Sequence, residues 1–214
     1  MFKTISNSNL IESKIEVKKS IFISNIAYVE TEADALLKIE EVKEKYKDAT
    51  HNVFAYLVLD NGEKYRCSDD GEPAKTAGAP ILSLIQGREL KNILVVVTRY
   101  FGGTELGTGG LVKAYTDATQ VGLANLNIIN KSEGLKIKVE VMYEDLEPLK
   151  RNIEEYNRNN KEEYVKILDT KYSDKVSLYL FISYDKFKDE EDLKEEIVKN
   201  IQLQDLEILE EGIE

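Results

Sequence analysis

At the centre of the chain stands the run Ile93-Leu94-Val95-Val96-Val97-Thr98-Arg99-Tyr100-Phe101-Gly102-Gly103. Its first five residues are apolar with no polar residue between them, a pattern typical of a strand that is covered on both faces. The run is preceded by Ser68-Asp69-Asp70-Gly71-Glu72-Pro73, which we call the acidic loop, and followed by Gly107-Thr108-Gly109-Gly110, which we call the glycine loop. We therefore expect one buried central strand with two unusual loops, and a scaffold built around them.

The segments around this stretch predict a mixed α+β domain. Residues 11–28 predict two extended segments joined by a turn at residues 18–20. Thr31 and Asp34 have the spacing of a capping box, so a helix is expected over residues 31–47. Residues 53–59 and 64–67 predict two strands joined by the hairpin turn Asp60-Asn61-Gly62-Glu63. Further helices are expected at residues 79–86 and 109–126.

The last third of the chain has a pattern of its own. Residues 130–134 predict a linker, because they are polar and contain glycine. Strands are then expected at residues 137–141, 164–170, 176–182 and 206–209, with helices at residues 146–156 and 193–198. This β-α-β-β-α-β order predicts a ferredoxin-like arrangement. We therefore expect an α+β protein of two domains, residues 1–131 and 135–214.

Charge is unevenly distributed along the 214 residues, whose formal net charge is -11. Residues 1–130 contain 15 Lys and Arg against 17 Asp and Glu, whereas residues 131–214 contain 14 against 23. Phosphate neutralisation supplies most of the affinity of nucleic-acid-binding domains, so the acidic second half disfavours RNA as a general partner. A local basic face that binds RNA remains an alternative.

The sequence also indicates where in the cell the protein is located. No apolar run approaches the roughly 20 residues that a membrane-spanning helix needs, so no membrane association is expected. The first ten residues contain no apolar signal segment, and the single cysteine, Cys67, excludes an internal disulfide. We expect a soluble cytoplasmic protein.

The acidic loop holds three carboxylates within four residues, Asp69, Asp70 and Glu72. Such a group suits general acid–base chemistry or the binding of a hard cation, but Asp-Gly-Glu-Pro also makes a good turn without any chemistry. Arg99, at the end of the central strand, could pair with one of these acids as a structural bridge or bind a phosphate.

The glycine loop precedes a helix, where backbone N–H groups are available to an anion. Its spacing matches neither the dinucleotide fingerprint nor the phosphate loop of nucleotide-hydrolysing enzymes. The alternative is that its glycines supply positive φ angles and close backbone approach. Lys113 and Tyr115 either line the same cleft or are a surface cation and a core aromatic residue.

His51 is the only histidine of the chain. No candidate nucleophile near it stands in a nucleophile elbow, so a hydrogen-bonded histidine at the mouth of a strand is the favoured interpretation. One histidine and one cysteine do not suffice for a zinc site, and we predict no metal site and no cofactor.

The motifs as a set resemble the YigZ/IMPACT family. The similarity covers about residues 15–126 and rests on Ala49-Thr50-His51, the acidic loop, Thr76-Ala77-Gly78, Val96 to Gly103, and Leu106 to Tyr115. The resemblance implies an N-terminal α/β sandwich like that of a ribosomal small-subunit protein domain and of GHMP-type small-molecule kinases. It also implies a ferredoxin-like C-terminal domain similar to one in elongation factor G.

The resemblance further implies a role, because the eukaryotic relatives act in translational control by competing for a partner that activates an initiation-factor kinase. We expect a binding or regulatory protein without established catalysis, whose partner is a translation-related protein or the ribosome. The alternative is an enzyme or small-molecule binder for a phosphorylated or anionic ligand. The candidate binding residues are His51, Asp69, Asp70, Glu72, Thr76, Arg99, Gly102, Gly103, Gly107, Gly109, Gly110, Lys113 and Tyr115.

Overall fold

The computed structural model of the protein describes residues 1–187 and 190–213. The chain forms two compact α+β units, one of Phe2–Asn130 and the other of Lys131–Glu214 together with Met1. Within the described residues, no helix is both long enough and apolar enough to cross a membrane.

A five-stranded antiparallel sheet forms the centre of the N-terminal unit, with the strand order β2-β3-β6-β4-β5. The strands are β2 (Ile11–Val17), β3 (Ser20–Tyr28), β4 (His51–Leu59), β5 (Glu63–Ser68) and β6 (Ile93–Tyr100). β6 is the middle strand, and all its residues from Ile93 to Arg99 are buried. This confirms the predicted central strand that is covered on both faces.

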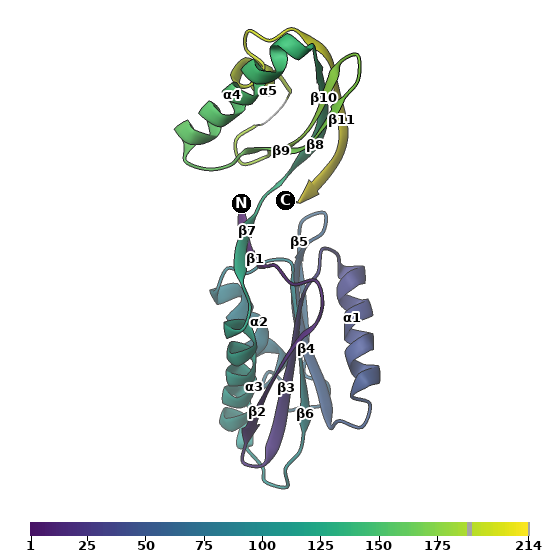
Figure 1. Ribbon diagram of the computed structural model, residues 1–214. Coiled ribbons are helices and arrows are strands. Elements are labelled where there is room, and N and C mark those ends of the chain that lie inside the picture. Colours follow the sequence, from purple (N-terminus) through teal and green to yellow (C-terminus); the bar gives the residue numbers. More distant parts are fainter. Residues whose placement is uncertain (188–189, 214) are drawn as a thin grey trace. The chain divides into compact units, whose positions relative to one another are not determined.

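Helices cover both faces of this sheet (Figure 1). α1 (Glu32–Lys45) lies on one face, where its apolar side chains pack with those of β4 and β6. α2 (Gly78–Gly87) and α3 (Gly107–Ala124) lie on the other face, over a larger core that includes Phe22 and Tyr115. The apolar residues of β6 alternate between these two cores, which explains why the strand shows no polar alternation.

Local sequence signals account for several boundaries. The Thr31 hydroxyl accepts a hydrogen bond from the Asp34 N–H and the Asp34 carboxylate accepts one from the Thr31 N–H, so the predicted capping box is present. The turn between β4 and β5 has positive φ at Asn61 (51°) and Gly62 (108°), as the Asn-Gly pair predicts.

The sequence did not predict two short strands, β1 (Phe2–Ile5) and β7 (Ile128–Lys131), which pair with each other. The predicted linker at residues 130–134 is therefore mostly strand, because β7 ends at Lys131 and β8 begins at Glu133. Strands of four residues carry little periodic signal, and these two form by pairing with each other across more than 120 residues of sequence. The helix predicted at residues 109–126 begins and ends two residues earlier, at Gly107 and Ala124.

The C-terminal unit has the predicted β-α-β-β-α-β order. Its elements are β8 (Glu133–Val141), α4 (Tyr143–Asn160), β9 (Val165–Tyr172), β10 (Val176–Ser183), α5 (Glu190–Glu196) and β11 (Leu203–Ile213). The sheet is antiparallel with the order β11-β8-β10-β9, and residues of both helices pack in one apolar core with its strands. The last strand is longer than the predicted residues 206–209 because it pairs with all of β8.

Candidate functional site

A cavity of about 410 Å³ lies where the motif segments of the N-terminal unit meet. The start of β4, the acidic loop, the end of β6 and the start of α3 all contribute to it. Its lining residues are Thr50, His51, Glu72, Pro73, Arg99, Phe101, Glu105, Leu106, Gly107, Thr108 and Leu111.

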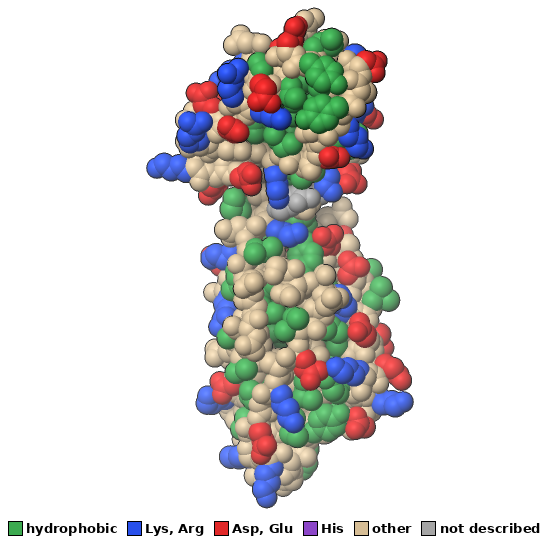
Figure 2. All heavy atoms as spheres, in the orientation of Figure 1, with side chains coloured by type: hydrophobic (Ala, Val, Ile, Leu, Met, Phe, Trp, Pro, Cys, Tyr) green, Lys and Arg blue, Asp and Glu red, His purple; other side chains and the backbone are tan. Residues whose placement is uncertain are grey.

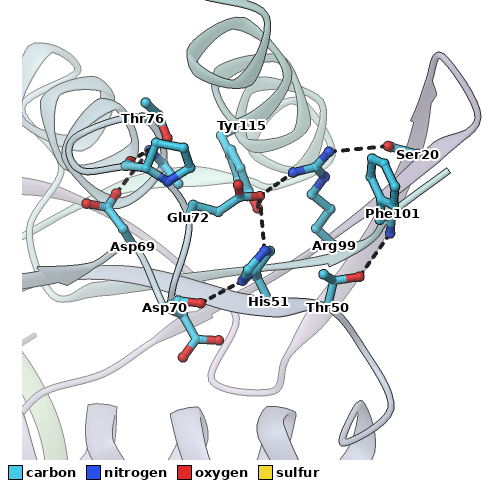
Figure 3. A network of polar contacts seen from close by, with 12 residues as sticks. Ser20, Thr50, His51, Asp69, Asp70, Glu72, Thr76, Arg99, Phe101 and Tyr115 are labelled. Carbon is cyan, nitrogen blue, oxygen red and sulfur yellow. Dashed lines mark hydrogen bonds and ion pairs between the residues drawn. The ribbon is translucent and has the colours of Figure 1, made fainter. Parts of the chain in front are cut away.

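A buried ion pair forms the polar floor of this cavity. Arg99 Nη1 donates to Glu72 Oε1 over 2.6 Å, and only 6% and 3% of the two side chains are exposed. The Tyr115 hydroxyl donates to the same oxygen over 2.7 Å (Figure 3). The acidic loop, β6 and α3 are thereby joined at one carboxylate. Charge-assisted hydrogen bonds of this kind offset the cost of removing the charges from water.

Aromatic rings surround the same pair. The Arg99 guanidinium lies 5.5 Å from the ring centre of Phe22 and 5.6 Å from that of Phe101. Tyr115 meets Phe22 edge-on, with the ring centres 5.1 Å apart. Burial, followed by the hydrogen bond to Glu72, raises the pKa of Tyr115 far above the usual tyrosine value. Its hydroxyl therefore stays protonated and remains a donor to Glu72.

His51 is oriented by the backbone of the acidic loop. Its Nδ1 lies 2.7 Å from the Asp70 carbonyl oxygen, which can only accept, so Nδ1 carries the proton of the neutral ring. Its Nε2 then presents a lone pair 3.9 Å from Glu72 Oε1. The loop reaches this position with positive φ at Asp70 (44°) and Gly71 (86°), and a Cβ on Gly71 would lie 3.4 Å from the imidazole.

The other two acids of the loop hold backbone in place and do not line the cavity. Asp69 Oδ1 accepts from the N–H groups of Ala77 and Gly78, and its Oδ2 accepts from that of Lys75. Asp70 Oδ2 accepts from the Asn52 N–H over 2.6 Å. Of the three predicted carboxylates, therefore, only Glu72 faces the cavity, and the interpretation of Asp69 and Asp70 as turn-forming residues fits their contacts.

Thr76 and four of the five predicted glycines also lie outside the lining. The Thr76 hydroxyl donates to the Pro73 carbonyl within the loop. Gly102 passes so close to Lys19 that a Cβ would lie 2.1 Å from its carbonyl carbon. Gly103 has a φ of 83°. A Cβ on Gly110 would lie 3.1 Å from Leu106, whereas one on Gly109 would meet open space. Gly107, with a φ of 68°, lines the cavity.

The structure decides two points that the sequence left open, the position of Lys113 and the partner of Arg99. Lys113 does not lie at the cavity, because its side chain is 76% exposed and its Nζ pairs with Asp117 over 2.7 Å, one turn along α3. The surface-cation alternative therefore describes Lys113, and the core-aromatic alternative describes the buried Tyr115. The expected bridge from Arg99 to one of the three acids of the loop is present, and its partner is Glu72.

Sequence reasoning missed several residues that complete the site. The Thr50 hydroxyl accepts from the Phe101 N–H, and Ser20 Oγ accepts from the Gly102 N–H and, over 3.5 Å, from Arg99 Nη2. Ser20 could not be found from local pattern, because only the register of β3 against β6 brings it near Arg99. Phe101 carried a signal, since a large aromatic residue between a strand and two glycines is unusual for a loop. It is 49% exposed at the cavity.

Comparison with known proteins gives matches to a family domain and to relatives that carry the same family name. Residues 18–123, which include Ser20 and every cavity residue, match the Impact N-terminal domain. An IMPACT family member of Haemophilus influenzae is 36% identical over 170 residues, 78% of this chain and 79% of that protein. The IMPACT family member YvyE of Bacillus subtilis is 41% identical over 120 residues, which span 56% of this chain but only 55% of YvyE. The crystal structure of a hypothetical protein aligns with a TM-score of 0.60 at 29% identity, over 98% of both chains.

Proposed function

Because the chain belongs to the IMPACT family, we propose that it is a binding protein with a regulatory role linked to translation. The family resemblance supports the link to translation, since the eukaryotic relatives act in translational control. In this proposal the cavity of the N-terminal unit holds part of a protein partner, and no catalytic step is involved.

The observation that carries this proposal is the construction of the cavity. Its floor holds the ion pair of Glu72 and Arg99. Its wall carries the apolar side chains of Pro73, Leu106 and Leu111. The half-exposed Phe101 stands beside them. Aromatic side chains next to a preformed pocket are typical anchors of protein interfaces.

A phosphorylated or anionic ligand has weaker support. The N-terminus of α3 favours it, because Leu106 caps the helix without a side-chain hydrogen bond and Gly107 and Thr108 line the cavity. The charges oppose it. The lining contains one arginine, already paired with Glu72, and a second glutamate, Glu105. Lys113 points elsewhere, so we favour a protein partner.

RNA is also disfavoured as the direct partner. Residues 131–214 keep their excess of acidic residues, and Figure 2 shows Lys and Arg side chains interspersed with Asp and Glu on the drawn face of each unit. A broad basic surface would be expected of a nucleic-acid-binding protein. A protein component of the translation apparatus in the cytoplasm fits this charge distribution better. We also propose that the C-terminal unit is ferredoxin-like.

Co-sedimentation with ribosomes at low salt tests the proposal. We expect the wild type to pellet with ribosomes or to capture a ribosome-associated protein, and we expect Phe101→Ala with Glu105→Ala to abolish this. Both side chains are exposed, so the fold should persist. Leu37→Ala with Glu41→Ala is the matched control, because it removes an exposed apolar residue and an acid from α1. If the double variant Phe101→Ala with Glu105→Ala still pellets with ribosomes like the wild type, the cavity does not bind the partner.

A further inference from the structure

The geometry points to a primary ammonium group, as carried by a lysine side chain, as the ligand of this cavity. The inference rests on the proposed function, because a lysine of the protein partner is the source that the site fits best. Four features of the lining support it, and each is a hydrogen-bond acceptor, a negative charge or an aromatic face.

The first feature is a pair of acceptors that face each other without a donor. Since His51 Nδ1 donates to the Asp70 carbonyl, Nε2 of the neutral ring carries a lone pair, and it lies 3.9 Å from Glu72 Oε1. Two acceptors at this distance cannot bond to each other and gain from a donor that reaches both. An ammonium group has three donors and no acceptor, so it suits this position better than any anion does.

The second feature is the other oxygen of the same carboxylate. Within the described part of the chain, the contacts of Glu72 to Arg99, Tyr115 and His51 all go to Oε1, and none is made by Oε2. Among the described residues, the side-chain polar atoms that lack both a partner and solvent are Asn25 Nδ2, Asn92 Nδ2 and Arg99 Nε. Glu72 Oε2 is not one of them, so this 97% buried side chain keeps one unbonded oxygen open to the cavity that it lines.

The third and fourth features are the carboxylate of Glu105 and the exposed ring of Phe101. A cation beside an aromatic face gains electrostatic attraction, and a second carboxylate adds to it. The apolar side chains of Leu106, Leu111 and Pro73 offer contact to the methylene groups of a lysine side chain. A cavity of about 410 Å³ has room for such a chain.

Arg99 and the start of α3 do not cancel this preference. Arg99 Nη1 donates to Glu72, its Nη2 turns toward Ser20 (Figure 3), and its unpartnered Nε is buried away from solvent, so no Arg99 nitrogen is presented to a ligand. The backbone N–H groups at Gly107 and Thr108 would donate to a carbonyl oxygen of the peptide that carries the lysine. Peptide-borne lysine is thereby favoured over a free polyamine, which has no acceptor for them.

The test is a titration of the isotope-labelled full chain, followed by the backbone amide signals of Phe101 to Leu111 and the His51 ring signals. The probes are acetyl-Ala-Lys-Ala-amide, the same peptide with norleucine in place of lysine, the same peptide with glutamate, and spermidine. We expect saturable shifts at the cavity with the lysine peptide and none with the norleucine or glutamate peptide. Stronger binding of spermidine than of the lysine peptide would assign the ammonium to a free polyamine.

Variants sharpen the test. Glu105→Gln should weaken the lysine peptide about threefold, as expected for one partly exposed charge. Phe101→Leu should weaken it by a similar factor, about threefold, through loss of the aromatic face. Glu40→Gln removes the same charge from an exposed position on α1 and should leave binding unchanged. Equal binding of the norleucine peptide, preference for the glutamate peptide, or no binding of either amine would each overturn the inference.

Failure here is distinguishable from failure of the proposed function. If ribosome co-sedimentation depends on Phe101 and Glu105 while no amine probe binds, a partner is held through other chemistry and the ammonium inference alone is wrong. If the lysine peptide binds and nothing co-sediments, the ligand class stands and the link to translation is wrong.

Discussion

Glu72 and Arg99 form a buried ion pair in which Nη1 lies 2.6 Å from Oε1, and this pair joins the acidic loop to the end of the central strand. The two residues are 27 positions apart in the sequence. Because the pair is both buried and at the cavity, it connects the stability of the N-terminal unit to the shape of that cavity.

We expect the removal of one partner to destabilise the protein more than the removal of both. Glu72→Gln leaves the Arg99 charge buried without a counter-charge, and such a loss typically costs about 3 kcal/mol or more of the free energy of unfolding. The double change Glu72→Gln with Arg99→Met should be less destabilising than the sum of the two single changes. Urea unfolding of all three variants measures this.

The control for the ion pair is Lys113→Gln, which breaks the exposed pair with Asp117 and should change the free energy of unfolding by less than about 0.5 kcal/mol. Additive costs of the two single changes would show that Glu72 and Arg99 do not depend on each other.

A second prediction concerns Asp69, whose carboxylate accepts hydrogen bonds from the backbone of Lys75, Ala77 and Gly78. Asp69→Ala leaves the start of α2 without these acceptors and should cost about 1–2 kcal/mol. Asp69→Asn keeps the oxygen that serves Ala77 and Gly78, so it should recover part of the loss. Thermal unfolding compares the two, and equal losses would argue against the role of Asp69 as an acceptor.

The fold was predictable from the sequence where local pattern determines it. The apolar run at Ile93, the capping box at Thr31 and the Asn61-Gly62 turn each specify their element through short-range physics. The strands β1 and β7 were not predicted, because they are stabilised by pairing with each other over a long sequence separation. Such pairing leaves no periodic signal in either segment.

The candidate site was predictable in its residues more than in their roles. Glu72, Arg99 and His51 were named as candidates because they stand in unusual loops beside a buried strand, and all three line the cavity. Asp69 carries a carboxylate like Glu72, and Lys113 carries a positive charge like Arg99. Only the path of the backbone decides which of these residues line the cavity and which cap a helix or lie on the surface. Ser20 illustrates the limit, because strand register alone brings it to Arg99.

The glycines of the motif provide a matched pair of substitutions. A Cβ at Gly102 would lie 2.1 Å from the Lys19 carbonyl carbon and 2.3 Å from the Ser20 nitrogen, so Gly102→Ala must displace β3. Gly109 has nothing within 4 Å of its Cβ position and lies in the first turn of α3. Gly109→Ala should therefore be neutral or stabilising by up to about 1 kcal/mol. Thermal unfolding of both variants checks this, and a tolerated Gly102→Ala would contradict the close approach of the two segments.

The last prediction concerns the response of stability to alkaline pH. Burial raises the pKa of Tyr115 in the folded protein, so the folded state binds the phenol proton more tightly than the unfolded state does. The stabilising contribution is therefore complete below the unfolded value of about 10 and declines as the pH rises above it.

Tyr115→Phe removes the ionisable group and should flatten the loss of stability above about pH 10, although it also deprives Glu72 of a donor and lowers stability at neutral pH. Urea unfolding across the alkaline range measures the slope, and the phenolate absorbance of the native protein should be the same in wild type and Tyr115→Phe, because Tyr115 stays protonated until the protein unfolds. An equal pH slope in wild type and Tyr115→Phe would show that this hydroxyl is not protected by the site.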